Sequence, residues 1–246
     1  MRKNLFILFL LLIHLSTHSQ DGKNHFSSGE KLRYIIYYGI IDGGFIEAQL
    51  NMVNFEGKKV YHSKMLGKTT GITDRLYKVR DEYQAYFDPL TILPYKSIRD
   101  ISEGRYKKYN VVSWDHDSLR VTNIDRDTFE ITPDMRDMVS VFHLIRNSDF
   151  ERMQYDDLIK VNTFFDNELF PFDMRYRGIE TIKTRMGKFK CIKLVPYVEP
   201  GRIFNSEDDM TIWLSADKNR VPVRVKFDLK VGSIKIDLIA YSGLKY

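Results

Sequence analysis

The chain's sharpest alternation of apolar and polar residues is Val221-Pro-Val-Arg-Val-Lys-Phe227, followed by Ile234-Lys-Ile-Asp-Leu-Ile-Ala240. Apolar residues at every second position are typical of a β-strand with one buried face, so the two runs predict two strands. Pro222 lacks an amide donor, which predicts that its strand either lies at a sheet edge or begins there. The polar run Asp217-Lys-Asn-Arg220 predicts a turn back to an earlier strand, Thr211-Ile-Trp-Leu214.

The same period recurs near the N-terminus, in 32–38 and in 46–52. In the first run Leu32, Tyr34, Ile36 and Tyr38 share one face of the predicted strand, and Arg33, Ile35 and Tyr37 share the other. In the second run Ile46, Ala48, Leu50 and Met52 share one face. A turn at Asp42-Gly-Gly44 is predicted between them, which makes a hairpin with one solvated face.

Short turn signals follow at 56–57, 88–89, 103–104, 115–117 and 125–127, and strand patterns resume at 161–165, 173–182 and 189–195. Connections this short suit antiparallel neighbours, because parallel strands need crossovers of about a dozen residues or more. The predicted fold class is therefore all-β with one amphipathic helix, an antiparallel meander that forms a curved, partly closed barrel.

One stretch departs from the strand period. Thr132 can cap a helix, Pro133 suits its first position, and apolar residues recur at helical spacing up to Asn147. These residues are Met135, Met138, Val139, Phe142 and Ile145. They predict an amphipathic helix of about four turns from Pro133 to Arg146, packed across the concave side of the sheet. A membrane or ligand surface is the other interpretation of this Met-rich stripe.

The first residues have the form of an export signal: Arg2 and Lys3, an apolar run of nine residues from Leu5 to Ile13, and small residues up to Ser19. Nine residues rise only about 14 Å as a helix, too short for a hydrocarbon core of ~30 Å. We therefore expect cleavage after Ser19, a single β-rich domain over 20–246 with no transmembrane segment, and a periplasmic or secreted location. Cys191 is the only cysteine, so we expect no lipoprotein and interpret this thiol as a small buried hydrophobe.

Composition excludes some partners. The mature chain would carry 36 basic and 33 acidic residues, a net charge of +3, with no run of five basic residues. Because the basic residues are dispersed and nearly balanced by acidic ones, we expect no nucleic-acid partner. We expect a lipophilic small molecule or an envelope protein as partner, and oligomeric state stays open.

The search for catalytic and metal-binding motifs is negative. His25, His62, His116 and His143 lack the spacing of a metal site, and no nucleophile elbow, phosphate loop or dinucleotide fingerprint occurs. We therefore predict no catalytic residue, no metal and no cofactor. Acidic pairs such as Asp115 with Asp117 fit turns. The run Glu207-Asp208-Asp209 before Trp213 fits either a solvated loop or a sugar-binding platform.

Several segments resemble an exported bacterial family named domain-of-unknown-function 3108. The resemblance rests on Met210 to Val225 with Val231-Gly-Ser-Ile234, on Gly29-Glu-Lys-Leu-Arg-Tyr34, and on the run from Asp137 to Arg146. It also includes Tyr83 to Pro94 and Glu103-Gly104-x-Tyr106, so that it spans about 29–241. Ala216 departs from the acidic residue expected beside Asp217. The resemblance implies export and a β-rich fold, and it supplies no catalytic residues.

Three hypotheses for function follow. The first is a binding protein for an apolar or amphipathic component of the cell envelope, the second an envelope interaction module with a filled core, and the third a glycan or ester hydrolase. The candidate ligand-binding residues for the first are Ile46, Ala48, Leu50, Met52, Met138, Phe142 and Trp213.

Overall fold

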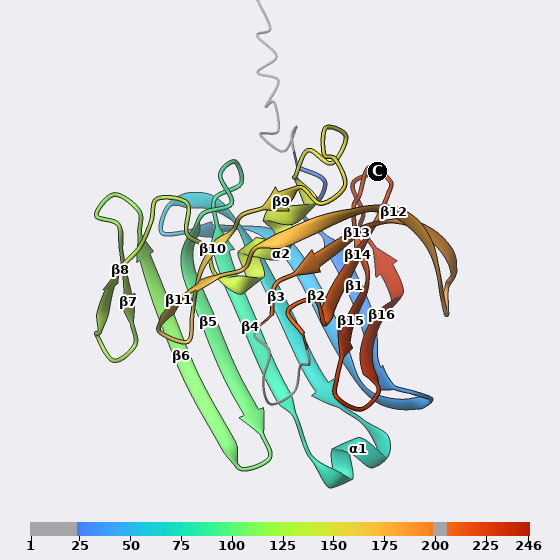
Figure 1. The fold of residues 1–246 in the computed structure, drawn as a ribbon. Coiled ribbons are helices and arrows are strands. Elements are labelled where there is room, and N and C mark those ends of the chain that lie inside the picture. The colour runs from blue at the N-terminus through green and yellow to red at the C-terminus, as the bar shows by residue number, and fades with distance from the viewer. Residues whose placement is uncertain (1–23, 199–205) are drawn as a thin grey trace, which may run out of the picture.

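The computed structural model describes residues 24–198 and 206–246, which are mostly β-strand (Figure 1). The predicted signal peptide, Met1 to Ser19, lies outside the described residues. The N-terminal strands are β1 (Glu30–Tyr38), β2 (Ile41–Phe55), β3 (Lys58–Thr69), β4 (Arg80–Phe87), β5 (Pro94–Glu103), β6 (Tyr106–Asp115), β7 (Arg120–Asn123) and β8 (Thr128–Glu130). The later strands are β9 (Leu158–Ile159), β10 (Asn162–Phe165), β11 (Glu168–Pro171), β12 (Met174–Thr184), β13 (Gly187–Pro196), β14 (Met210–Ser215), β15 (Pro222–Asp228) and β16 (Ser233–Ser242). The helices are α1 (Gly71–Leu76) and α2 (Met138–Arg146).

Within the described residues, fourteen strands form one sheet in the order β8-β7-β6-β5-β4-β3-β2-β1-β16-β15-β14-β13-β12-β9. Every neighbouring pair is antiparallel, and β1 joins the two meanders by pairing with β16. The predicted antiparallel β fold is confirmed. The sheet does not close into a barrel, because β8 and β9 at its ends each pair with one neighbour.

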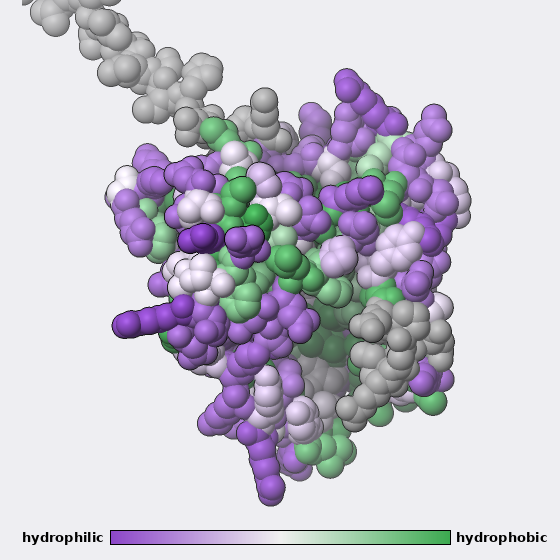
Figure 2. Space-filling view, turned by 60° about the vertical axis from the view of Figure 1, so that its left-hand side comes forward, coloured by the Kyte–Doolittle hydropathy of each residue, from purple (hydrophilic) through white to green (hydrophobic). Residues whose placement is uncertain are grey.

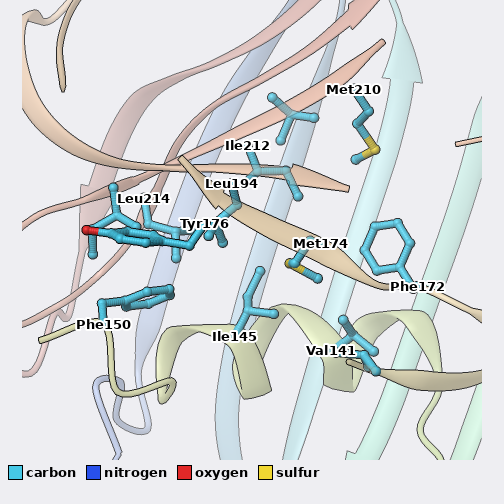
Figure 3. Close-up of a cluster of buried hydrophobic side chains, with 13 residues drawn as sticks. Val141, Ile145, Phe150, Phe172, Met174, Tyr176, Leu194, Met210, Ile212 and Leu214 are labelled. Carbon is cyan, nitrogen blue, oxygen red and sulfur yellow. The ribbon is translucent and has the colours of Figure 1, made fainter. Parts of the chain in front are cut away.

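Helix α2 lies between the two meanders (Figure 1). Val139 packs with Leu50 and Ala85 of the N-terminal meander. Val141 and Ile145 pack with Met174 and Leu194 of the C-terminal meander, where they project from the helix toward these strands (Figure 3). The helix therefore holds the two halves of the sheet around a shared interior, as the sequence predicts.

The helix begins five residues later than predicted. Thr132 and Pro133 belong to a turn, and Arg136 pairs with Thr163 in a parallel bridge, which keeps this segment extended. Asp137 caps the helix instead, since its Oδ1 accepts hydrogen bonds from the backbone N–H groups of Val139 and Ser140 at 2.8 and 3.1 Å. A buried carboxylate cap outcompetes the threonine because it satisfies two backbone donors at once.

The predicted turn at Asp42-Gly-Gly44 is wrong. The chain turns at residues 39–40, and Asp42 to Gly44 lie inside β2. The register with β1 shifts between Ile36 and Tyr37 and leaves Gly43 as the extra residue of a bulge. At Gly44 a side chain would meet the backbone of Lys68, so glycine here permits the close approach of β3.

Pro222 is the first residue of β15, and this strand lies between β14 and β16. Of the two predicted alternatives, the strand start is confirmed and the edge position is wrong. Asp217 makes the predicted turn, because its Oδ1 accepts hydrogen bonds from the backbone N–H groups of Asn219 and Arg220. Helix α1 was not predicted, because its six residues are too few for a periodic pattern to be recognised.

Cys191 is fully buried beside Ile182, Trp213 and Val223, as predicted for a small core hydrophobe. Burial raises the pKa of its thiol to about 12. The thiol is therefore protonated at neutral pH and is a poor nucleophile.

The two helix positions Ile145 and Phe142 should differ in their cost of truncation. Ile145 is fully buried, whereas Phe142 is only partly buried and faces a cavity. If Phe142 were fully buried, Phe142→Ala would lower the free energy of unfolding by about 3–5 kcal/mol. Because the side chain is only partly buried, we expect a loss of about 1–2 kcal/mol. Ile145→Ala should lower the free energy of unfolding by about 2–5 kcal/mol. Urea melts of the two variants test this order, and equal losses would contradict it.

Candidate functional site

The two meanders and α2 enclose a cavity of about 410 Å³. Figure 2 shows a hollow on one face of the molecule, with hydrophobic side chains at its bottom. The walls come from the concave face of β1 to β4, from β14 to β16 and from α2. This volume falls within the range of about 300–1,000 Å³ that holds small molecules in proteins.

The register of β1 to β4 arranges one wall in four rungs, from α2 toward α1. Side chains at every second residue of a strand share a face, so each rung contributes inward-facing residues at one height. The rung beneath α2 holds Glu30, Leu50, Ser63 and Ala85. The next rungs are Leu32 with Ala48, Met65 and Tyr83, then Tyr34 with Ile46, Gly67 and Asp81, and last Ile36 with Gly44 and Thr69.

The opposite wall is apolar. It consists of Met210 on β14, Val225 and Phe227 on β15, and Ile236 on β16. Helix α2 adds Val139 and Phe142, and the buried side chains of Figure 3 fix the helix on β12 to β14. Most of the cavity surface is therefore aliphatic or aromatic.

A buried ion pair stands at the α2 end of the cavity. Nη1 and Nη2 of Arg146 donate to Oε1 and Oε2 of Glu30 at 2.6 and 2.7 Å, and both side chains are about 2% exposed. The guanidinium also donates to the backbone carbonyl oxygens of His25 and Asn219. Because Glu30 neutralises its charge and its donors are engaged, Arg146 offers little to an incoming anion.

His143 and Ser63 form a second polar pair at this end. The Nε2 of His143 lies 3.0 Å from the Oγ of Ser63, and the imidazole packs between the rings of Phe26 and Phe87. Its Nδ1 is buried without a hydrogen-bond partner in the described residues. Burial, followed by the charge of Arg146, lowers the pKa of His143 well below its ordinary value. The imidazole is therefore neutral at neutral pH.

Tyr34 adds a phenol to the cavity wall. The residue is 7% exposed and lines the cavity on the rung of Ile46. Burial raises its pKa far above the ordinary value, while Arg146 and Glu30 act on it in opposite directions. A phenol hydroxyl on the cavity wall can donate a hydrogen bond to, or accept one from, a molecule in the cavity.

The structure places four of the seven candidate ligand residues on the cavity: Ile46, Ala48, Leu50 and Phe142. Met52 packs instead against the core beside Leu50 and Tyr61. Met138 lines a separate hollow of about 50 Å³. The residues that sequence reasoning missed are those of β3, which was not identified as a strand, and the polar group Glu30, Tyr34, Ser63, His143 and Arg146.

Trp213 does not form a sugar-binding platform. Its indole is buried with Cys191 and Val223, away from the cavity, and its Nε1 donates to Glu180 at 2.6 Å. Asp208 pairs with Arg175 rather than with a group beside the indole. A sugar platform needs an exposed ring face, so this interpretation is wrong.

Other acidic residues occupy turns, as expected from their local hydrogen bonding. Asp115 accepts from the backbone N–H groups of Asp117 and Ser118, and Asp88 accepts from those of Leu90 and Thr91. Among the described residues, no cluster of three or more His, Cys, Asp or Glu side chains could hold a metal ion. In the same residues no helix has the length and hydrophobicity to cross a bilayer.

The family model described as "Protein of unknown function (DUF3108)" matches residues 33–239. The chain belongs to the DUF3108 family. This match confirms the resemblance found in the sequence. It includes the strands of the cavity wall except for the first three residues of β1 and the last three of β16. No curated protein matches the sequence.

One solved structure has a similar fold, and two others align over most of their length with lower scores. A beta-barrel-like protein of domain of unknown function DUF1849 from Brucella abortus superposes with a TM-score of 0.60 at 7% identity, covering 89% of this chain and 98% of that one. A protein from Parabacteroides distasonis has a TM-score of 0.39 at 14% identity, covering 89% and 99%. A DUF1089 family protein from Pseudomonas aeruginosa has a TM-score of 0.35 at 8% identity, covering 81% and 90%. The first of these structures shares the barrel-like fold.

Proposed function

We propose that this DUF3108 protein is an exported binding protein for an amphipathic component of the cell envelope. The observation that supports this most is the cavity of about 410 Å³, which has apolar walls and is roofed by a helix. A core that served only to hold the fold would be packed to the density of other protein interiors, with few voids larger than a water molecule. Apolar cavities of this size bind apolar molecules.

The polar end of the cavity favours a ligand whose polar group is uncharged. Arg146 is neutralised by Glu30, and His143 is neutral because burial lowers its pKa. A carboxylate or phosphate buried here would lack a countercharge, which is costly in a site of low dielectric constant. Tyr34 and Ser63 can instead exchange hydrogen bonds with a hydroxyl, ester or amide group.

The volume favours a ligand with one hydrocarbon chain. At about 410 Å³ the cavity lies near the lower end of the range for small-molecule sites. Apolar side chains of successive rungs, among them Leu50, Met65 and Ile46, line the cavity along its length. A single hydrocarbon chain can therefore extend from the polar end toward α1. A monoacylglycerol or a long-chain alcohol has this chemistry.

Tyr34→Phe tests the polar end directly. The variant removes one hydroxyl and keeps the ring, so the cavity walls are preserved. We expect affinity for a monoacylglycerol to fall about tenfold, which corresponds to one lost hydrogen bond of about 1.4 kcal/mol. Affinity for an apolar fluorescent dye without a polar end should stay unchanged. Fluorescence titration measures both, and an equal affinity of variant and wild type for the monoacylglycerol would contradict the assigned role of Tyr34.

A hydrolase is the second candidate, because Ser63 and His143 lie within hydrogen-bond distance. A serine nucleophile needs a base that a third group orients, usually a carboxylate on the other imidazole nitrogen. In this structure that nitrogen faces a buried apolar environment without such a carboxylate. The pair therefore fits ligand binding better, and labelling of Ser63 by a fluorophosphonate would reverse this preference.

Export rests on the leader sequence, which has a basic start, an apolar run of nine residues and small residues up to Ser19. We propose a periplasmic or secreted location for the mature chain. N-terminal sequencing of protein from its own cells should begin at Gln20 or within about two residues of it. An intact Met1 on protein in a membrane fraction would contradict this location.

A further inference from the structure

Two turns and a helix carry strongly exposed apolar side chains at one end of the sheet. Ile40, Leu76 and Val231 are 97%, 80% and 76% exposed, the highest values of any large hydrophobic residue that the structure describes. They come from the β1–β2 turn, from the end of α1 and from the β15–β16 turn. Ile41 and Ile72 are exposed beside them. We call these five residues the apolar rim.

Contacts between the segments show that the apolar rim is one surface. The hydroxyl of Tyr38 donates to the backbone carbonyl of Val231 at 2.9 Å, which joins the β15–β16 turn to β1. Gly43 of β2 lies against Thr73 of α1. Figure 1 shows α1 and the two turns together at the lower end of the molecule. Scattered exposed apolar residues are ordinary, but a gathered group of this kind marks a contact surface.

Basic side chains accompany the apolar rim. Arg75 precedes Leu76, Lys230 precedes Val231, and Lys78 follows α1, all of them exposed. The acidic residues Asp42 and Asp74 at this end are each paired with an arginine. Glu103 also lies at this end, because the backbone N–H of Gly104 donates to the carbonyl oxygen of Lys78. The apolar rim is therefore accompanied by exposed Lys and Arg side chains, although the end as a whole is not free of acidic residues.

The apolar rim also lies beside the cavity. Thr69 and Val79, which flank α1 in the sequence, both line the cavity wall. A molecule that docks by this end would place the α1 end of the cavity against the surface it binds.

We propose that the apolar rim docks on the surface of a lipid bilayer that contains anionic lipids. Aliphatic side chains at turn tips can enter the headgroup region, and neighbouring Lys and Arg side chains are attracted to anionic headgroups. A protein partner is less favoured, because the exposed apolar side chains come from separate segments, namely two turns and a short helix. The inference does not depend on a ligand in the cavity.

Vesicle flotation tests the proposal with the mature protein. We expect wild type to float with vesicles of phosphatidylglycerol and phosphatidylethanolamine, and at least tenfold less with vesicles of phosphatidylcholine alone. The triple variant Ile40→Ser, Leu76→Ser and Val231→Ser should lose at least tenfold of its vesicle binding. Leu90→Ser is the matched control, since Leu90 is 59% exposed in a turn at the opposite end. Thermal melts should show that both variants remain folded, because substitutions at exposed sites change stability little.

Three results would overturn the proposal. Wild type could fail to float with either vesicle, the triple variant could float as well as wild type, or Leu90→Ser could lose as much binding as the triple variant. Capture of a single envelope protein by wild type and not by the triple variant, without vesicle binding, would assign the apolar rim to a protein partner instead.

Discussion

Arg146→Met should destabilise the protein by about 3–5 kcal/mol. The substitution removes the countercharge of Glu30, whose side chain is about 2% exposed, and so leaves a buried carboxylate unpaired. It also removes the donors that satisfy the backbone carbonyl oxygens of His25 and Asn219. Urea unfolding followed by circular dichroism measures the loss.

Arg152→Met is the matched control for this prediction. Arg152 pairs with Asp149, but the two side chains are 88% and 57% exposed. An exposed pair contributes at most about 1 kcal/mol, so the control should unfold close to wild type. A loss below about 1 kcal/mol in Arg146→Met would show that the ion pair does not hold the N-terminal segment to α2 and β15.

Ala48→Trp should reduce the ligand content of the purified protein more than tenfold while its melting temperature stays within a few degrees. Ala48 lines the cavity in the middle of the wall, between Leu32 and Met65 on the neighbouring strands. An indole at this position would fill space that the proposed ligand occupies. Because the cavity has room for the larger side chain, the usual penalty for overpacking a core should be small.

Asn51→Trp provides the control for Ala48→Trp, because Asn51 lies on the exposed face of the same strand. This variant should keep its full ligand content. If the melting temperature of Ala48→Trp collapses, Ala48→Met tests the same position with a smaller and more flexible side chain. Full ligand content in a folded Ala48→Trp protein would contradict the assignment of the cavity as the binding site.

Much of the fold could be predicted from local sequence periodicity. Alternation of the kind seen from Ile46 to Leu50 requires only a strand with one face toward the interior, and short turns favour antiparallel neighbours. The run from Val221 to Phe227 does not keep one buried face, because a bulge opposite Trp213 and Leu214 places Val223 with Cys191 and leaves Val225 on the cavity side. The helix start could not be predicted, because Asp137 competes with Thr132 as a cap and the bridge between Arg136 and Thr163 depends on residues far apart in the sequence. The glycine at position 44 likewise reflects a contact between strands, the close approach of the Lys68 backbone of β3.

The apolar part of the site could be predicted better than its polar part. Ile46, Ala48 and Leu50 were found because they share the inward face of an alternating strand. Glu30 and Arg146 are 116 residues apart, and Ser63 and His143 are 80 apart, so no local pattern joins them. Trp213 was misassigned because alternation identifies the two faces of a strand without showing which of them lines the cavity. The indole lies on the other face, where it packs with Cys191 and Val223.

The most direct measurement is native mass spectrometry of the mature protein, purified from the envelope of its own cells and compared before and after extraction with organic solvent. We expect a bound species of defined mass that extraction removes, and that the extract contains as an uncharged amphiphile with one hydrocarbon chain. Ala48→Trp purified in parallel should lack it. Wild-type protein that arrives at the mass of its polypeptide alone, from cells grown in several conditions, would contradict the proposed binding function.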